Sequence, residues 1–263
     1  MLKNRAELLK ELEDLFGQRV FLITYNYSSN PPIGFIEPGD ELYFRQFRED
    51  VLKGGGISQC VFILNGPGGN IKTAIACSQI LRDALLRYDC FVPTVVGSSL
   101  CYFILQSDRL FIGNKSKITQ IDPLFNYEGV DMRAIEHLND PNLEIRRLAH
   151  DIHNSTLENL RRALKTVPHV FEKDVSIQSQ KRVGYMEKMV NLWMQKSSHD
   201  KQLTIEDLKN LRVKFRQIQE DIIEKGKILI QECQKELVEE NKRFVIQTSK
   251  IEDEKYLGGY FYS

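Results

Sequence analysis

The chain has 263 residues, and its 36 basic and 36 acidic side chains cancel to a formal charge of zero at neutral pH. Proteins dedicated to nucleic acids normally carry a basic excess, so this balance argues against that class and no nucleic-acid partner is expected. Apolar residues make up 42% of the chain, as is ordinary for a globular protein, and a core of this size needs no disulfide or structural metal.

The cysteines and the longest uncharged segment indicate the compartment. Five cysteines lie far apart without a CxxC pair, which is typical of reduced thiols in the cytoplasm, and their spacing suits no metal site. The uncharged segment at 91–107 contains Pro93 and Gly97 and is at the lower limit for a membrane span. Residues 1–16 lack the apolar stretch of a secretory signal. We expect a cytoplasmic protein with no membrane span and no bound metal.

The first half of the chain alternates short apolar runs with amphipathic segments. The apolar runs predict strands at residues 20–25, 61–64, 90–96 and 110–112. The amphipathic segments predict helices at residues 41–53, 71–88 and 98–107. Strands that alternate with helices of this length indicate βαβ units, so we expect an α/β fold with a parallel sheet and flanking helices.

After about residue 128 the strand pattern fades and helices dominate the prediction. Helices are expected at residues 143–165, 184–196, 204–211 and 215–240, followed by a terminal strand and an aromatic tail. Within the last helix, an apolar stripe of roughly coiled-coil spacing suggests self-association, with packing on the chain's own core as the alternative. The stripe consists of Ile218, Ile222, Leu229 and Leu237.

A glycine-rich loop, Asn65-Gly66-Pro67-Gly68-Gly69-Asn70, separates a predicted strand from the helix that follows it. Glycines permit backbone angles closed to other residues and leave N–H groups open toward a phosphate, a carboxylate or an oxyanion. The spacing matches neither GxxxxGK[ST] nor GxGxxG, so no nucleotide cofactor is expected. Taken alone, the loop is best interpreted as a tight turn between strand and helix.

A second strand-to-helix junction contains Gly97, Ser98 and Ser99. Either serine is a possible nucleophile, although a serine at this place more often caps the helix. The two junctions follow successive parallel strands, and open α/β sheets bind their ligands at the carboxyl ends of such strands. Together the junctions therefore indicate a site more strongly than either does alone.

Five motifs follow one another along the chain. They are LNGPGGN at 64–70, VPTVVGSSL at 92–100, DRLFIG at 108–113, IDP at 121–123 and SHDKQLTIEDLKNL at 198–211. In this order they resemble the Clp-protease/crotonase superfamily, and most of all the serine dehydrogenase proteinase family, which is related to signal peptide peptidase A. The resemblance covers about residues 4–213. We therefore expect a Clp/crotonase-like domain at 1–213 and a helical C-terminal extension at 214–263.

The resemblance implies a serine hydrolase site. Ser98 falls on the position of the nucleophile, the N–H groups of Gly68 and Ser99 on those of the oxyanion hole, and Pro67 and Gly69 beside the substrate. Relatives use a lysine or a histidine as general base, but the position expected to carry lysine is Asn154. The candidate bases are His153 first, His150 second and His199 third.

Three functions are compatible with these residues. The first is an ATP-independent serine peptidase that cleaves peptides or proteins, requires no cofactor and forms a homo-oligomer. The second is a catalytically degenerate relative that binds peptide or assembles a complex; Asn154 favours it, as does Leu100, which replaces a small residue of the family. The third is a crotonase-type acyl-CoA enzyme, for which the matched loops offer no convincing carboxylate.

Overall fold

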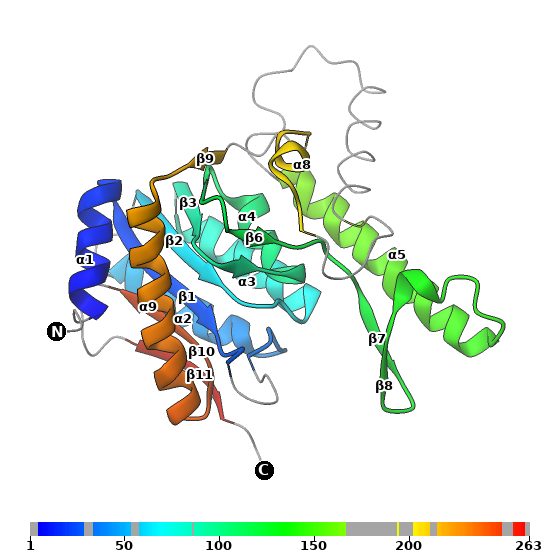
Figure 1. Cartoon of the computed structure of the whole chain (residues 1–263). Coiled ribbons are helices and arrows are strands. Elements are labelled where there is room, and N and C mark those ends of the chain that lie inside the picture. The colour runs from blue at the N-terminus through cyan, green and yellow to red at the C-terminus, as the bar shows by residue number, and fades with distance from the viewer. Residues whose placement is uncertain are drawn as a thin grey trace.

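A seven-stranded sheet runs through the centre of the molecule (Figure 1). The computed structural model describes residues 5–28, 34–53, 58–85, 87–166, 194, 202–210, 215–248 and 255–260. The strands, in their order across the sheet, are β11 (Lys255–Tyr260), β10 (Lys242–Thr248), β1 (Arg19–Tyr25), β2 (Gln59–Asn65), β3 (Arg87–Val92), β5 (Leu110–Ile112) and β9 (Phe215–Gln217). The run from β1 to β9 is parallel, whereas β10 pairs antiparallel with β1 and with β11.

Helices cover both faces of this sheet (Figure 1). On one face lie α2 (Asp40–Lys53), α3 (Ile71–Ala84) and α4 (Cys101–Gln106), and on the other lie α1 (Arg5–Phe16) and α9 (Glu220–Glu239). Along β1, side chains alternate between the two cores: Phe21 and Ile23 pack with the first group of helices, Val20 and Leu22 with the second. Burial on both faces explains why the strand sequences are continuously apolar.

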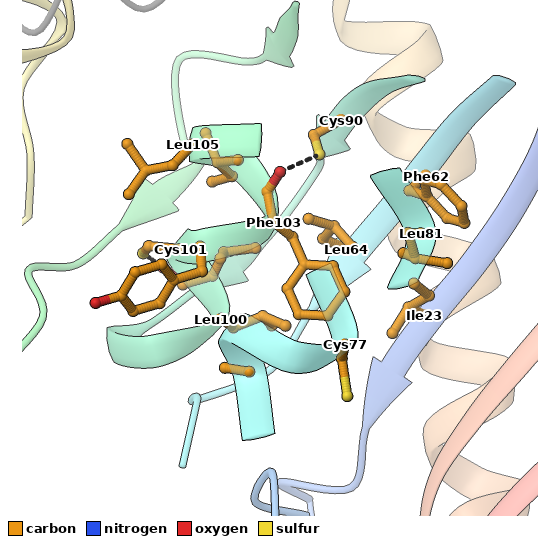
Figure 2. Close-up of a cluster of buried hydrophobic side chains, with 14 of the residues drawn as sticks. Ile23, Phe62, Leu64, Cys77, Leu81, Cys90, Leu100, Cys101, Phe103 and Leu105 are labelled. Carbon is orange, nitrogen blue, oxygen red and sulfur yellow. Dashed lines mark hydrogen bonds between the residues drawn. The ribbon is translucent and has the colours of Figure 1, made fainter. Parts of the chain in front are cut away.

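The core on the α3 and α4 side is shown in Figure 2. Phe62 of β2 and Leu81 of α3 are fully buried, as is Phe103 of α4. The Cys90 thiol of β3 donates to the Phe103 carbonyl over 3.5 Å and thereby joins β3 to α4. This core fixes the short helix that begins just after Ser98.

A hairpin and a long helix project from the sheet (Figure 1). The hairpin consists of β7 (Leu124–Tyr127) and β8 (Val130–Arg133), and it packs on α5 (Leu143–Thr166) around Phe125 and Ala149. Two shorter elements lie nearer the sheet: the pair of β4 (Val95–Val96) with β6 (Lys117–Ile118), and helix α8 (Ile205–Asn210). Short 3-10 helices occupy Ser98–Leu100 and Ala134–Glu136.

The expected α/β fold with a mostly parallel central sheet and flanking helices is confirmed, with several local differences. The strand expected at 90–96 is two strands, interrupted at Pro93, which has no N–H group for a ladder. The helix expected at 215–240 begins only at Glu220, because Phe215–Gln217 pairs with β5 at the sheet edge. The hairpin β7–β8 was not predicted. The helix expected at 184–196 falls, apart from Met194, outside the described residues.

The described residues beyond 213 belong to the same sheet and cores as those before it. They supply β9, α9, β10 and β11, and the terminal strand expected after 240 is β10. The division of the chain at 213 stays a prediction. Of the two roles open to the apolar stripe, the structure supports packing on the chain's own core, because Leu229 and Leu237 are buried there with Ile218 and Ile222 packed beside them. Self-association remains a prediction without this surface.

Among the helices of the described ranges, none combines the length and the apolar character that crossing a bilayer requires.

Candidate functional site

The glycine loop and the Ser98 junction lie in contact. Gly66 N–H donates to Val95 O over 3.0 Å, and Gly97 N–H donates back to Gly66 O over 2.9 Å. A Cβ placed on Gly68 would lie 2.6 Å from Gly97 O and 2.8 Å from Ser98 Cβ. Gly68 also has a φ of +102°, which L side chains rarely adopt. Only glycine therefore permits this close approach. The two junctions, residues 65–70 and 96–100, are together called the junction site below.

Ser98 has an unusual backbone. Its φ is +48°, in the left-handed region, although it is not a glycine. The two other described residues of this kind have local reasons: Glu128 turns the β7–β8 hairpin, and Asn241 follows the end of α9. Ser98 lies in no hairpin or helix C-terminus, so its conformation is held by its surroundings. Its N–H donates to Thr119 Oγ1 over 3.0 Å, and its side chain is half-buried.

Two backbone N–H groups beside Ser98 are open. Within the described part of the chain, the N–H groups of Gly68 and Ser99 have no hydrogen-bond acceptor, although Gly68 is buried and Ser99 is only 1% exposed. A Cβ on Gly68 would lie 2.9 Å from Ser99 N, so the two residues are close neighbours. Buried N–H groups are nearly always paired, and such a pair beside a serine suits a negatively charged oxygen.

A cavity of about 510 Å³ adjoins the junction site. The junction site contributes Ser98 and Ser99 together with Pro67 and Gly69. Facing walls come from residues 35–38, from residues 121–124, and from α5 through Ile152, Ser155 and Thr156. The volume is within the range of small-molecule and peptide side-chain pockets, and much of the lining is apolar.

One wall of the cavity is held by a residue of the C-terminal strand β10. The wall segment, residues 35–38, pairs with the glycine loop, since Ile36 N–H donates to Gly68 O over 2.8 Å and Asn70 N–H to Ile36 O over 2.6 Å. Arg243 donates to Phe35 O over 2.8 Å and forms a buried ion pair with Asp40. Burial raises the pKa of Asp40, although Arg243 beside it acts in the opposite direction.

The charged side chains that line the cavity are neutralised in part. Glu37 lies 3.3 Å from Arg243, and Asp122 forms an ion pair with Arg133. Lys72 at the start of α3 is exposed at the cavity. In the described ranges no three acidic, cysteine or histidine side chains gather where a metal ion would bind.

The candidate bases are placed less favourably. His153 is half-buried on α5 beside Ile152 but is not a lining residue of the cavity, and the exposed His150 directs Nε2 to Leu138 O at 2.9 Å. Asn154, the expected lysine position, is exposed. His199 lies outside the described residues. Of the histidines that the structure describes, none lines the cavity.

Sequence reasoning missed two residues of the site. Thr119 directly follows β6, where it forms an isolated bridge with Gln202, and its sequence context had no distinguishing pattern. Arg243 had no distinguishing signal either, since it ends a polar, mostly charged run at 239–243 just before the apolar residues of the strand.

Comparison with known proteins adds little. No model of a known protein family matches the chain, and a search of curated proteins finds no similar sequence. Among solved structures, the chain is similar to a mutant of the 1510-N membrane-bound stomatin-specific protease, with 13% identity and a TM-score of 0.38, over 71% of this chain and 93% of that one. What the chain does has to be inferred from the geometry of its own site.

Proposed function

We propose that this chain is a serine peptidase-like hydrolase of the Clp-protease/crotonase type, with Ser98 as nucleophile and the N–H groups of Gly68 and Ser99 as oxyanion hole. The observation that carries the proposal is the junction site: a serine in a left-handed backbone, against a glycine that no other residue can replace, beside two buried N–H groups without acceptors. Backbone outliers of this kind cluster at active sites.

The proposed reaction follows from this geometry. Ser98 Oγ attacks the carbonyl carbon of a peptide bond, and the carbonyl oxygen becomes an oxyanion between the two N–H groups. Each preorganised donor of this kind typically contributes about 3 kcal/mol to the stabilisation of the transition state. The substrate is a peptide or protein whose residue at the cavity is apolar, as the lining at Phe35, Ile71 and Ile152 favours.

The mechanism also needs a group that takes the proton of Ser98, and we assign this role to a histidine. His153 remains the first candidate, because its neighbours Ile152 and Ser155 both line the cavity. His150 comes second, since its ring is engaged by Leu138. His199 precedes Gln202 by three positions, and Gln202 pairs with Thr119 beside Ser98, so its replacement belongs in the same test.

A second function, peptide binding without catalysis, is favoured by one specific observation. The wall that α5 presents to the cavity consists of Ile152, Ser155 and Thr156, and none of these side chains accepts a proton near neutral pH. The same cavity and the same two N–H groups would then hold a peptide carbonyl without cleaving the chain.

Labelling with a fluorophosphonate tests the proposal, because this reagent forms a covalent bond only with an activated serine. We expect one label per chain, located on Ser98 by peptide mass spectrometry. It should be absent from Ser98→Ala and retained in Ser155→Ala, which removes another hydroxyl of the same cavity. A folded wild-type chain that takes no label, while binding an apolar fluorescent peptide as tightly as Ser98→Ala does, would establish the second function instead.

A further inference from the structure

Thr119 is tied to the junction site by its side chain and by its backbone. Its Oγ1 accepts the Ser98 N–H over 3.0 Å, and its own N–H donates to Val96 O over 3.0 Å. Its carbonyl accepts the Cys101 thiol over 3.2 Å, and it forms an antiparallel bridge with Gln202. Thr119 therefore contacts the chain on both sides of Ser98, and its hydroxyl has a defined place.

Gly97 and Thr119 fit each other closely. A Cβ on Gly97 would lie 2.8 Å from Pro67 O, which excludes larger residues there, and 3.2 Å from Thr119 Oγ1, so the hydroxyl approaches the backbone of Gly97 closely. Threonine is branched at Cβ, and few rotamers are open to it. Once the backbone of Thr119 is fixed, its Oγ1 is fixed with it.

We propose that Thr119 is a positioning residue for the reaction of Ser98. By accepting the Ser98 N–H, it holds the left-handed backbone that presents the Ser98 side chain. It also removes that N–H from competition, so that the N–H groups of Gly68 and Ser99 are the donors open to a substrate carbonyl. This inference rests on the proposed function and goes beyond it, because it identifies what sets the geometry of the nucleophile.

Three variants separate this role from simple packing. Thr119→Val keeps the branched shape and replaces the accepting hydroxyl by a methyl group. Thr119→Ala removes the hydroxyl and puts no other group in its place, and Thr119→Ser keeps the hydroxyl. Circular dichroism and thermal unfolding select the folded variants. Two quantities are then measured on these full-length chains. The first is the exchange rate of the Ser98 amide proton by NMR. The second is the rate of fluorophosphonate labelling at several reagent concentrations, which separates reagent binding from bond formation.

We expect the Ser98 amide to exchange at least 10-fold faster in Thr119→Val or Thr119→Ala than in the wild type, and the bond-forming rate to fall at least 10-fold with unchanged reagent binding. Thr119→Ser should restore both to within about threefold. The proposal would be overturned if folded Thr119→Val or Thr119→Ala were labelled at the wild-type rate. It would also be overturned if Thr119→Ser were labelled as slowly as those two variants. A wild-type chain that takes no label refutes the proposed function and the catalytic part of this inference, whereas amide exchange still decides whether Thr119 holds Ser98.

Discussion

The two sides of the cavity differ in how firmly they are built and in what chemistry they offer. The junction site is fixed by backbone hydrogen bonds and by the close approach of its glycines, where an added Cβ would lie less than 3 Å from neighbouring atoms. The α5 side presents Ile152, Ser155 and Thr156, and the Thr156 hydroxyl is already engaged by the Ile152 carbonyl over 2.9 Å. The junction site suits an oxyanion, whereas the α5 side chains that line the cavity offer no proton acceptor.

This difference separates two requirements of a serine hydrolase that are usually met together. Stabilising an oxyanion depends on backbone geometry, and any sequence that folds into the junction site provides it. Taking a proton depends on one ionisable side chain at hydrogen-bond distance, and a single substitution removes it. A chain can therefore keep the first property long after losing the second, and the following variants examine each side separately.

The largest effect, because it combines lost stability with lost labelling, is expected at Gly68. In Gly68→Ala the new methyl group would collide with Gly97 O, so the junction must open. We expect a loss of about 3 kcal/mol in the free energy of unfolding, from chemical denaturation, together with loss of labelling. Gly39→Ala is the matched control, because Gly39 has the same φ of +102° but nothing within 4 Å. Equal destabilisation by both changes would show that close approach at Gly68 is unimportant.

The next effect concerns Arg243, which joins the wall segment to the sheet. Arg243→Met leaves the buried Asp40 carboxylate without its cation, which should cost about 3–5 kcal/mol at pH 8. The double variant Asp40→Asn with Arg243→Met should recover part of that loss. If the double variant is no more stable than the single one, the buried charge is not the cause.

The same variant has a defined dependence on pH. Burial already raises the folded-state pKa of Asp40, and removing Arg243 raises it further. A carboxyl whose folded pKa is raised favours folding below its unfolded pKa, and this advantage is lost as the pH rises through the folded value. Denaturation at pH 5 and pH 8 should therefore show a smaller loss at pH 5. A loss that grows on acidification would contradict this assignment.

The smallest effect on stability, and the most direct test of the α5 side, is expected from two histidines of one helix. If His153 takes the proton of Ser98, His153→Ala should lower peptide hydrolysis at least about 100-fold with little change in unfolding. His150→Ala should leave the rate within about twofold, since His150 is exposed and directed to Leu138 O. Unchanged hydrolysis in His153→Ala moves the assignment to His150 and then to His199, and unchanged hydrolysis in both variants and in His199→Ala removes histidine from the mechanism.

Much of the fold could be predicted because its signals are local. The apolar runs of β1, β2 and β5 and the periodicity of α2 and α5 gave nearly the observed bounds. The contact of Gly68 with Ser98 was also expected, because both follow parallel strands. The contacts of Arg243 with Phe35 and Asp40 could not be predicted, since these residues lie some two hundred positions apart and the antiparallel pairing of β10 with β1 brings them together. The hairpin β7–β8 was missed because its strands are only half-buried and lack a continuous apolar run.

The position of Arg243 far after Ser98 in the sequence has a consequence for synthesis. A ribosome makes the wall segment, the glycine loop and Ser98 first, and Arg243, which holds this wall, follows more than 140 residues after Ser98. A chain that stops before β10 therefore has Ser98 and the glycine loop but lacks the contacts of Arg243 with Phe35 and Asp40 that hold the wall segment. The order of translation therefore makes the synthesis of β10 a condition for holding this wall in place.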